Sequence, residues 1–392
     1  MDNLTLNLLS LVNSSLKQEP SEIVLTKEMY KIAKENGLSG TLFPALKKEI
    51  QESDVYSLVQ KDYYEFISKD TVQMQAIEDL TSLFEENHIE HIFLKGSVLK
   101  KVYPASYMRS MGDIDFLVTN EKMNLVHQVL EESGYINWSN SKAHDCFHKN
   151  RQVFLEAHPT LNSDFDDAYK NLFKDVWSTC TSEGYVYKMN HETEITYLLF
   201  HMVKHLSSSG IGLRNILDLS LYLEKYDSEI SVDYLYSLLE KAKLERFAQN
   251  IFSLCILYFK PNLLQDYLKN YQMDQALIEE ATTFILTSGV HGKGENNNAH
   301  LSGSAKQSLK KNNVVIGRIA YLVKLVFPPF DTMRGMYPVL HKHPYLYPFT
   351  FLARWYKIFV KKRKTSFNKI KKLKITHNEI EQRRSLYERF GL

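Results

Sequence analysis

Along this chain the spacing of apolar residues changes twice. Leu, Ile and Val recur every three or four residues over 1–88, which predicts helices. From 89 to 192 short apolar runs alternate with short helical patterns, which predicts a small core of strands and helices. Helical spacing returns over 193–356, and a basic tail is expected over 357–392. We therefore expect an α+β fold in which a small mixed sheet is flanked by mostly helical regions.

Four segments of the core have the length and composition of strands. They are 89–96, 113–118, 151–161 and 184–189. The first segment breaks at Gly96 and leads into a short helical pattern, which Pro104 helps to end. In the helical parts, 54–87 predicts one long helix or two consecutive ones. The stretch 289–313 is rich in Gly, Asn and Ser and predicts a loop, and its HGKGENN sequence lacks the spacing of a P-loop.

The composition fits a globular protein in a reducing compartment. Three scattered cysteines, Cys146, Cys180 and Cys255, form no C-x-x-C pair, which argues against a disulfide framework and a cysteine zinc site. The N-terminus has no basic segment typical of a signal peptide, and the longest apolar run near the C-terminus is interrupted by Arg318 and Lys324. We expect a cytoplasmic protein.

Charge is distributed unevenly along the chain. Residues 357–392 hold twelve Lys or Arg and three Glu, a net charge of +9, which leaves −7 for the rest of a chain whose total is +2. This basic tail has three interpretations: a solvated helix face, a contact with anionic membrane lipids, or a contact with RNA or another polyanion. The second would make the protein peripheral at a membrane.

Two aspartates lie one residue apart in the second strand segment, at positions 113 and 115. Alternate residues of a strand point to the same face, so Asp113 and Asp115 project together while Ile114 and Phe116 point into the core. Two adjacent carboxylates repel each other unless a cation lies between them. Mg²⁺ prefers carboxylate oxygens and keeps positions open for substrate phosphates, with Mn²⁺ as the alternative cation.

A phosphate-binding turn is predicted just before these acids. Gly96 and Ser97 follow a strand and begin a helix, where free backbone N–H groups and a hydroxyl suit a phosphate. Lys95 and Arg109 flank this turn and can balance phosphate charge. Glu156, on the third strand segment, supplies a third acid, and His158 shares its face. The combination indicates a metal–phosphate site, against the alternative of a structural or degenerate version of it.

Four further residues are candidates for the cleft: His158, and His201, His205 and Arg214 on the following helices. His201 and His205 are four positions apart, with three interpretations: metal ligands, cleft-lining residues or structural residues. Arg214 and Asp218 have the same spacing, and their alternatives are a helix salt bridge or, for Arg214, a contact with the nucleotide or acceptor.

These motifs together resemble the bacterial uncharacterised nucleotidyltransferase family of the DNA polymerase β-like superfamily. The pattern K-G, Y-P, R and G-D-h-D is met by Lys95-Gly96, Tyr103-Pro104, Arg109 and Gly112-Asp113-Ile114-Asp115. Its later elements are met by Glu156 and His158, by His201 and His205, and by Leu213-Arg214 with Asp218. Pro159 follows His158 where relatives more often carry an aromatic residue. The C-terminal FPPF, YP and HPYLYP sequences are also similar to that family's end.

The resemblance implies a Mg²⁺-dependent nucleotidyltransferase that moves a nucleoside monophosphate from an NTP, ATP included, to an acceptor hydroxyl. It implies Asp113, Asp115 and Glu156 as metal ligands and catalytic residues, and Lys95, Gly96, Ser97 and Arg109 as nucleotide contacts. The acceptor stays open among a sugar, a peptide, a protein and tRNA. Two other functions stay open: a degenerate fold that binds without turnover, and a membrane-surface accessory protein of a polysaccharide or modified-peptide pathway. A metal-dependent glycosyltransferase is disfavoured because no nucleotide-sugar domain precedes the two aspartates.

Overall fold

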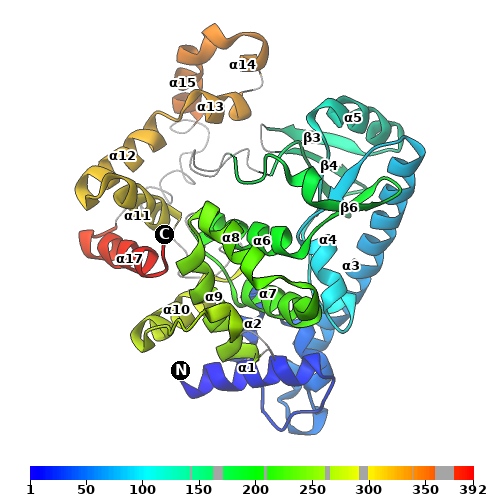
Figure 1. Cartoon of the computed structure of the whole chain (residues 1–392), viewed down its shortest axis with the longest axis vertical. Helices are drawn as coiled ribbons and strands as arrows, with labels where there is room; N and C mark the ends of the chain where they lie inside the picture. The colour runs from blue at the N-terminus through cyan, green and yellow to red at the C-terminus, as the bar shows by residue number, and fades with distance from the viewer. Residues whose placement is uncertain are drawn as a thin grey trace.

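A computed structural model gives the fold of the chain. It describes residues 1–141, 144–161, 171–206, 210–260, 265–290, 299–337, 339–357 and 375–392. Helices surround a mixed sheet, which confirms the predicted α+β class (Figure 1). The division into four regions stays a prediction.

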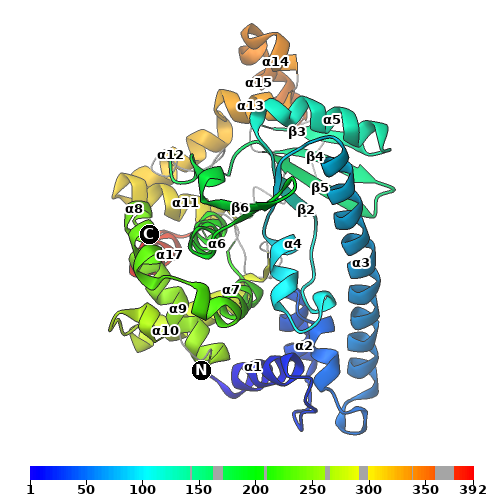
Figure 2. The same cartoon turned by 45° about the vertical axis from the view of Figure 1, so that its right-hand side comes forward.

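The N-terminal region is helical, as predicted. Its elements are α1 (Asn3–Leu16), α2 (Lys27–Glu35), η1 (Gly40–Ala45), η2 (Lys48–Ile50) and α3 (Ser53–Glu86). Asp2 and Thr26 cap α1 and α2 by accepting hydrogen bonds from backbone N–H groups of the first turn. The predicted helix at 54–87 is one continuous helix of 34 residues, about 50 Å long. It runs along one side of the molecule, from the N-terminal helices to the sheet (Figure 2).

The sheet has seven strands. They are β1 (His91–Phe93), β2 (Ile114–Leu117), β3 (Ile136–Asn140), β4 (Asp145–Lys149), β5 (Val153–His158), β6 (Cys180–Glu183) and β7 (Val186–Met189). Their order is β3-β4-β5-β2-β1-β7-β6, with parallel pairs β2–β5 and β1–β7 and antiparallel pairs elsewhere. Strands β1, β2, β5 and β7 lie in the segments predicted as strands. Strands β3, β4 and β6 were not predicted.

One face of the sheet packs on α3 and on α5 (Met123–Glu132). Ile114 and Phe116 of β2 are fully buried on this face, where the Phe116 ring lies 5.2 Å from that of Phe84 on α3. Alternation along the strand therefore turns the intervening Asp115 to the opposite face. Short helices connect β1 to β2: α4 (Gly96–Leu99), η3 (Lys100–Val102) and η4 (Ser106–Met108).

The C-terminal half is helical, as predicted. Its helices are α6 (His191–Leu206), α7 (Leu213–Tyr226), α8 (Val232–Ala242), α9 (Glu245–Phe259), α10 (Gln275–Ser288), α11 (Ala299–Lys311), α12 (Val314–Val326), α13 (Phe330–Met336), α14 (Val339–Lys342), α15 (Tyr347–Tyr356) and α17 (His377–Arg389). Helices α6 to α12 and α17 share one hydrophobic core with the N-terminal helices, and no residue of α13, α14 or α15 belongs to that core within the described part of the chain. The Asn13 side chain, for example, donates a hydrogen bond of 3.0 Å to the Tyr258 carbonyl.

Two segments near the C-terminus differ from expectation. The predicted loop at 289–313 contains helix α11, because buried Ser302, Ala305 and Ser308 give it a narrow face that packs closely on α12. The end of the predicted basic tail forms α17, and its Phe390 is fully buried in the main core. Residues 291–298 and 358–374 lie outside the described residues. Within the described part of the chain, no helix is long and apolar enough to cross a bilayer.

One buried acid ties stability to pH. Glu194 in the first turn of α6 is buried, its Oε1 atom has no hydrogen-bond partner among the described residues, and burial raises the pKa of Glu194 to about 8. The folded state thus binds this proton more tightly than the unfolded chain does. Protonated Glu194 therefore favours the folded state: its contribution to the free energy of unfolding is complete below pH 4.5 and is lost as the pH rises to about 8.

We expect Glu194→Gln to flatten this pH dependence. The variant should match the wild type near pH 5 and exceed its free energy of unfolding near pH 8 by a few kcal/mol, since one pKa unit corresponds to about 1.4 kcal/mol. Urea unfolding at a series of pH values measures the difference. Parallel pH profiles of the two proteins would contradict this account of Glu194.

Candidate active site

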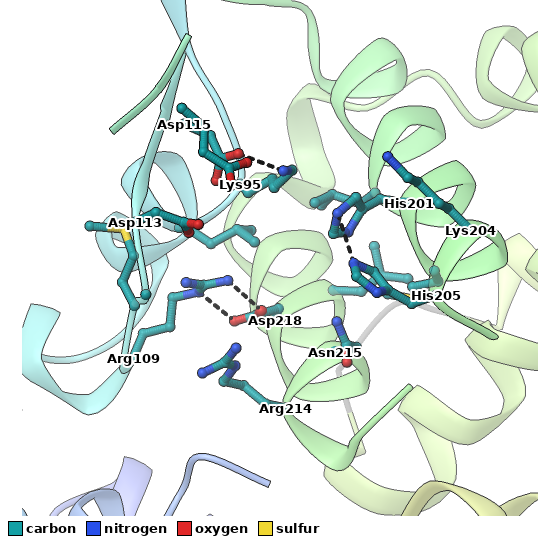
Figure 3. A pocket seen from close by; sticks show the side chains of 18 of the residues that line it. Lys95, Arg109, Asp113, Asp115, His201, Lys204, His205, Arg214, Asn215 and Asp218 are labelled. Carbon is teal, nitrogen blue, oxygen red and sulfur yellow. Dashed lines mark hydrogen bonds and ion pairs between the residues drawn. The ribbon is translucent and has the colours of Figure 1, made fainter. Parts of the chain in front are cut away.

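The candidate site is a cavity of about 270 Å³ between the sheet and helices α6 and α7 (Figure 3). One wall comes from β2, β5 and the turn at Lys95-Gly96, and carries Asp113, Asp115 and Glu156. The other wall comes from α6 and α7. Residues that the sequence places far apart therefore line one cavity.

The three acids converge because of the strand register. Asp115 of β2 is paired with Glu156 of β5 in a parallel ladder, so their side chains lie next to each other on the same face. Asp113 directly precedes β2 and lines the same cavity. The structure thus brings together the three acids that the sequence nominated.

Asp115 and Glu156 have cationic neighbours within the chain. The Lys95 ammonium lies 2.6 Å from Asp115 Oδ1, and His158 Nε2 lies 3.0 Å from the same oxygen and 3.6 Å from Glu156 Oε2. Burial works to raise the pKa of Asp115, but Lys95 and His158 outweigh it and hold this pKa well below its usual range. Burial works to lower the pKa of His158, and its bonds to the two acids raise it instead.

Asp113, unlike Asp115 and Glu156, has no cationic side chain bound to its carboxylate among the described residues. Burial, followed by the charges of Asp115 and Glu156, raises the pKa of Asp113 to about 7. A half-buried carboxylate that resists ionisation beside two others is the environment that a hard divalent cation stabilises. The residues present therefore fit Mg²⁺ or Mn²⁺ by donor type and by charge.

Two sets of donor atoms are close enough to share a metal ion. One is Asp115, Glu156 and His158, and the other is His144, Cys146 and Glu156. Asp113 lies outside both sets, although it lines the same cavity as Asp115 and Glu156. His158, expected only as a cleft residue, is thus placed among the candidate ligands. His144 and Cys146 were not predicted, because β4 was not recognised as a strand beside β5.

The turn at Lys95-Gly96 is tightly constrained. Lys95 has a φ of +48°, in a region that L side chains rarely adopt and that is concentrated at ligand sites. A Cβ atom on Gly96 would approach Met111 Cγ to 2.6 Å and Arg109 Nη1 to 2.7 Å, so any other residue would displace the side chains of Met111 and Arg109. Lys95 and Gly96 line the cavity. The Ser97 side chain does not: it is buried, with its hydroxyl 3.8 Å from the Met111 sulfur.

Arg109 makes a buried contact that the sequence did not predict. Its guanidinium donates two hydrogen bonds of 3.0 Å to Asp218 on α7 (Figure 3). The Tyr103 hydroxyl donates a third, of 2.8 Å, to the same carboxylate. All three side chains are buried. This network joins the segment before β2 to helix α7, so it fixes the width of the cavity.

Of the two interpretations of Arg214, a salt bridge with Asp218 is not formed among the described residues, and Asp218 is bound by Arg109. Arg214 Nη1 instead donates hydrogen bonds to the carbonyl and the hydroxyl of Ser110, at 2.8 and 2.7 Å. Its side chain is buried, its Nε has no hydrogen-bond partner in the described structure, and burial, aided by Arg109, lowers the pKa of Arg214 to about 10. Arg214 also lines the cavity.

The histidine pair on α6 faces the same cavity. The Nε2 atoms of His201 and His205 lie 3.0 Å apart, and both side chains line the cavity (Figure 3). Neither residue belongs to a group of three metal-binding side chains within the described residues. Lys204 and Asn215 also line it, although neither was predicted. Helical spacing from His201 is the signal that would have indicated Lys204.

Comparison with known proteins places the chain in a family. A family described as "Uncharacterised nucleotidyltransferase" matches residues 25–260, more than half of the chain, and the protein belongs to it. Membership of this family supports nucleotidyl transfer as the protein's class of function. No curated protein matches. Among solved structures, the antibiotic-resistance factor ANT(2'')-Ia is 13% identical, with 43% of this chain and 90% of that chain covered at a TM-score of 0.32. At this TM-score the similarity supports no conclusion.

We expect Asp218→Asn to destabilise the protein by about 3 kcal/mol, because it leaves the buried Arg109 guanidinium without a counter-charge. Asp233→Asn is the matched control: its carboxylate is fully exposed, and its loss should cost no more than about 0.5 kcal/mol. Urea unfolding of both variants provides the measurement. Equal, small losses would show that the Arg109–Asp218 contact contributes little.

Proposed function

We propose that the protein is a Mg²⁺-dependent nucleotidyltransferase, with Mn²⁺ as the alternative cation. It would transfer a nucleoside monophosphate from an NTP to an acceptor hydroxyl and release pyrophosphate. The single observation that carries this proposal is the convergence of Asp113, Asp115 and Glu156 in one cavity. Family membership gives the same reaction class independent support.

The acids would hold the cation together with the phosphates of the nucleotide. Asp113, Asp115 and Glu156 offer oxygen donors from two adjacent strands and the residue preceding one of them. A bound divalent cation would neutralise phosphate charge and polarise the α-phosphate. Lys95, now paired with Asp115, would be released to contact a phosphate oxygen when a cation takes its place at that carboxylate.

Transfer would require attack by the acceptor oxygen on the α-phosphorus. A bond forms between this oxygen and phosphorus, the bond from the α-phosphorus to the bridging oxygen breaks, and pyrophosphate leaves with the electron pair. The hydroxyl proton needs a base at the cavity wall. Glu156 is our candidate: burial works to raise its pKa, but His158, His144 and Lys95 together lower this pKa, which keeps the carboxylate ionised and able to accept a proton.

Ser97 and Arg109, which were predicted as phosphate contacts, need revised roles. Gly96 lines the cavity and would let phosphate approach the backbone, whereas Ser97 would have to turn away from Met111 to contribute its hydroxyl. Arg109 is engaged by Asp218, so we propose that it positions α7. Arg214, a buried cation without a carboxylate partner among the described residues, is the stronger candidate for a phosphate contact.

A second cavity next to the first is a candidate binding site for the acceptor. This cavity, of about 310 Å³, shares Met111, Gly112 and Arg214 with the first. Its remaining lining includes basic, acidic and amide side chains from α2 and α3, among them Lys34, Asp62, Lys69 and Gln73. This mixed polar lining suits an acceptor rich in hydroxyl or amide groups. We propose that the acceptor binds there.

Binding without turnover is the second candidate function. The observation in its favour is that Lys95 and His158 already compensate Asp115, and that the Ser97 hydroxyl points away from the cavity. Such a protein would bind an NTP but would not transfer it.

We expect the purified protein to transfer label from an α-labelled NTP to a component of a cell extract in the presence of Mg²⁺. Asp113→Asn, Asp115→Asn and Glu156→Gln should each reduce transfer at least about a hundredfold, since each removes a charge that holds the cation. Glu183→Gln, at an exposed position, should leave transfer unchanged and is the matched control.

The four NTPs and several extracts should be tested separately. NTP binding without transfer under all conditions would favour the second candidate function. A folded wild-type protein that binds no NTP would overturn both.

We expect Arg214→Gln to raise the KM for the NTP about tenfold to a hundredfold, because a charged hydrogen bond to phosphate is worth about 1.5–3 kcal/mol. Arg246→Gln, at an exposed position on α9, serves as the control. Steady-state kinetics with the NTP varied gives the comparison. An unchanged KM in a folded Arg214 variant would remove Arg214 from the nucleotide site.

A further inference from the structure

Helices α12 to α15 form an arm, residues 314–357, whose end lies opposite α1 in both views of the molecule (Figures 1 and 2). Among the described residues, eleven of the twenty exposed large hydrophobic side chains belong to this arm. The arm contains the FPPF, YP and HPYLYP sequences that resemble the family's end, but the family match covers only residues 25–260. The concentration of exposed apolar surface sets it apart from the rest of the chain.

Helix α12 has one packed face and one exposed apolar face. Gly317 lies against the backbone of Ser308 on α11, so this side of the helix is covered. On the other side, Val315, Ile319 and Val323 are 52–56% exposed. Their spacing of four residues aligns them along one stripe of the helix. The stripe therefore does not serve the contact with α11.

Helix α15 repeats this arrangement and is held in place by polar contacts. Arg354 donates hydrogen bonds to the carbonyls at the end of α12, of 2.9 Å to Leu325 and 3.2 Å to Val326. Its outward stripe consists of Phe349, Leu352 and Tyr356, at 57–69% exposure and a spacing of three and four residues. The arm is thus a folded unit with buried side chains of its own, such as Met333 and Leu340, and with two apolar stripes that face outward.

The arm is also the start of the most basic part of the chain. Residues 314–357 contain six Lys or Arg and one Asp, a net charge of +5, and the sequence directly after them, 358–374, adds eight Lys or Arg and no acid. A basic segment with an exposed apolar and aromatic face matches an anionic lipid surface, where head groups attract the cations and the acyl region accepts the apolar side chains.

We propose that the arm docks the protein on the surface of an anionic membrane, with Phe349 and Leu352 inserted at the interface. A dimer formed through the arm would bring the positive charges of two identical segments together, which disfavours a second copy of the chain as the partner. RNA would engage the charge and leave the apolar stripes exposed. A lipid surface satisfies both features, and a surface contact needs no spanning helix. The inference does not depend on the proposed nucleotidyl transfer.

Flotation of the full chain with vesicles tests this proposal. We expect binding to phosphatidylcholine vesicles that contain about 30% phosphatidylglycerol, little binding to phosphatidylcholine alone, and weaker binding as NaCl rises from about 0.1 to 0.5 M. Phe349→Glu combined with Leu352→Glu should weaken binding at least about tenfold, by losing insertion and adding negative charge. Leu6→Glu combined with Leu58→Glu, at exposed apolar positions on α1 and α3, should bind like the wild type.

Several results would overturn the proposal. Absence of wild-type binding to anionic vesicles, equal binding by the Phe349 and Leu352 variant, or equal loss in the Leu6 and Leu58 control would each do so. A wild-type dimer that the Phe349 and Leu352 variant dissociates, without vesicle binding, would assign the face to a second copy. Binding to a mixed-sequence RNA by wild type and variant alike, without vesicle binding, would assign the charge to nucleic acid.

Discussion

Mutual repulsion among Asp113, Asp115 and Glu156 is the constraint on which the site depends. The ladder between β2 and β5 forces two of these carboxylates together, and the preceding residue adds the third. Lys95 and His158 compensate part of the charge, while burial, followed by the charges of Asp115 and Glu156, keeps the pKa of Asp113 raised. A divalent cation that binds a nucleotide phosphate would neutralise the remaining negative charge of these acids. The geometry therefore favours phosphoryl chemistry over a structural role.

The scaffold keeps this repulsion from opening the cavity. Arg109 and Tyr103, before β2, bind Asp218 on α7, and Arg214 binds Ser110 in the same connection. Buried charged contacts of this kind are costly to break, so they hold the sheet and the helical wall at a fixed separation. Tyr103 and Arg109, which belong to the Y-P and R motifs, thus hold the two walls of the cavity at a fixed distance. Arg214, of the L-R motif, also binds the connection before β2 but remains available to a phosphate.

Local patterns predicted more of the fold than of the site. Strands β2 and β5 were predictable because alternation of apolar and polar residues reveals a buried strand. Strand β3 was not predictable because it is largely exposed and lacks a buried apolar pattern. Strand β4 was not predictable because its turn to β5 has Asn150 and Arg151 at positive φ, and of these two residue types only Asn is typical of such a turn. The partner of Arg109 could not be predicted, because Asp218 reaches it only through tertiary packing. The orientation of Ser97 toward Met111 is likewise a packing outcome.

The most direct test of the metal–nucleotide site is Mn²⁺ binding, measured by electron paramagnetic resonance with a non-hydrolysable NTP present. Mn²⁺ is a suitable probe because it accepts the same carboxylate and phosphate oxygens as Mg²⁺. We predict that the wild type binds Mn²⁺ more tightly with the nucleotide than without it, and that Asp115→Asn abolishes this nucleotide-dependent binding. Equal Mn²⁺ binding by the wild type and the variant would contradict the assignment of these acids to a metal site.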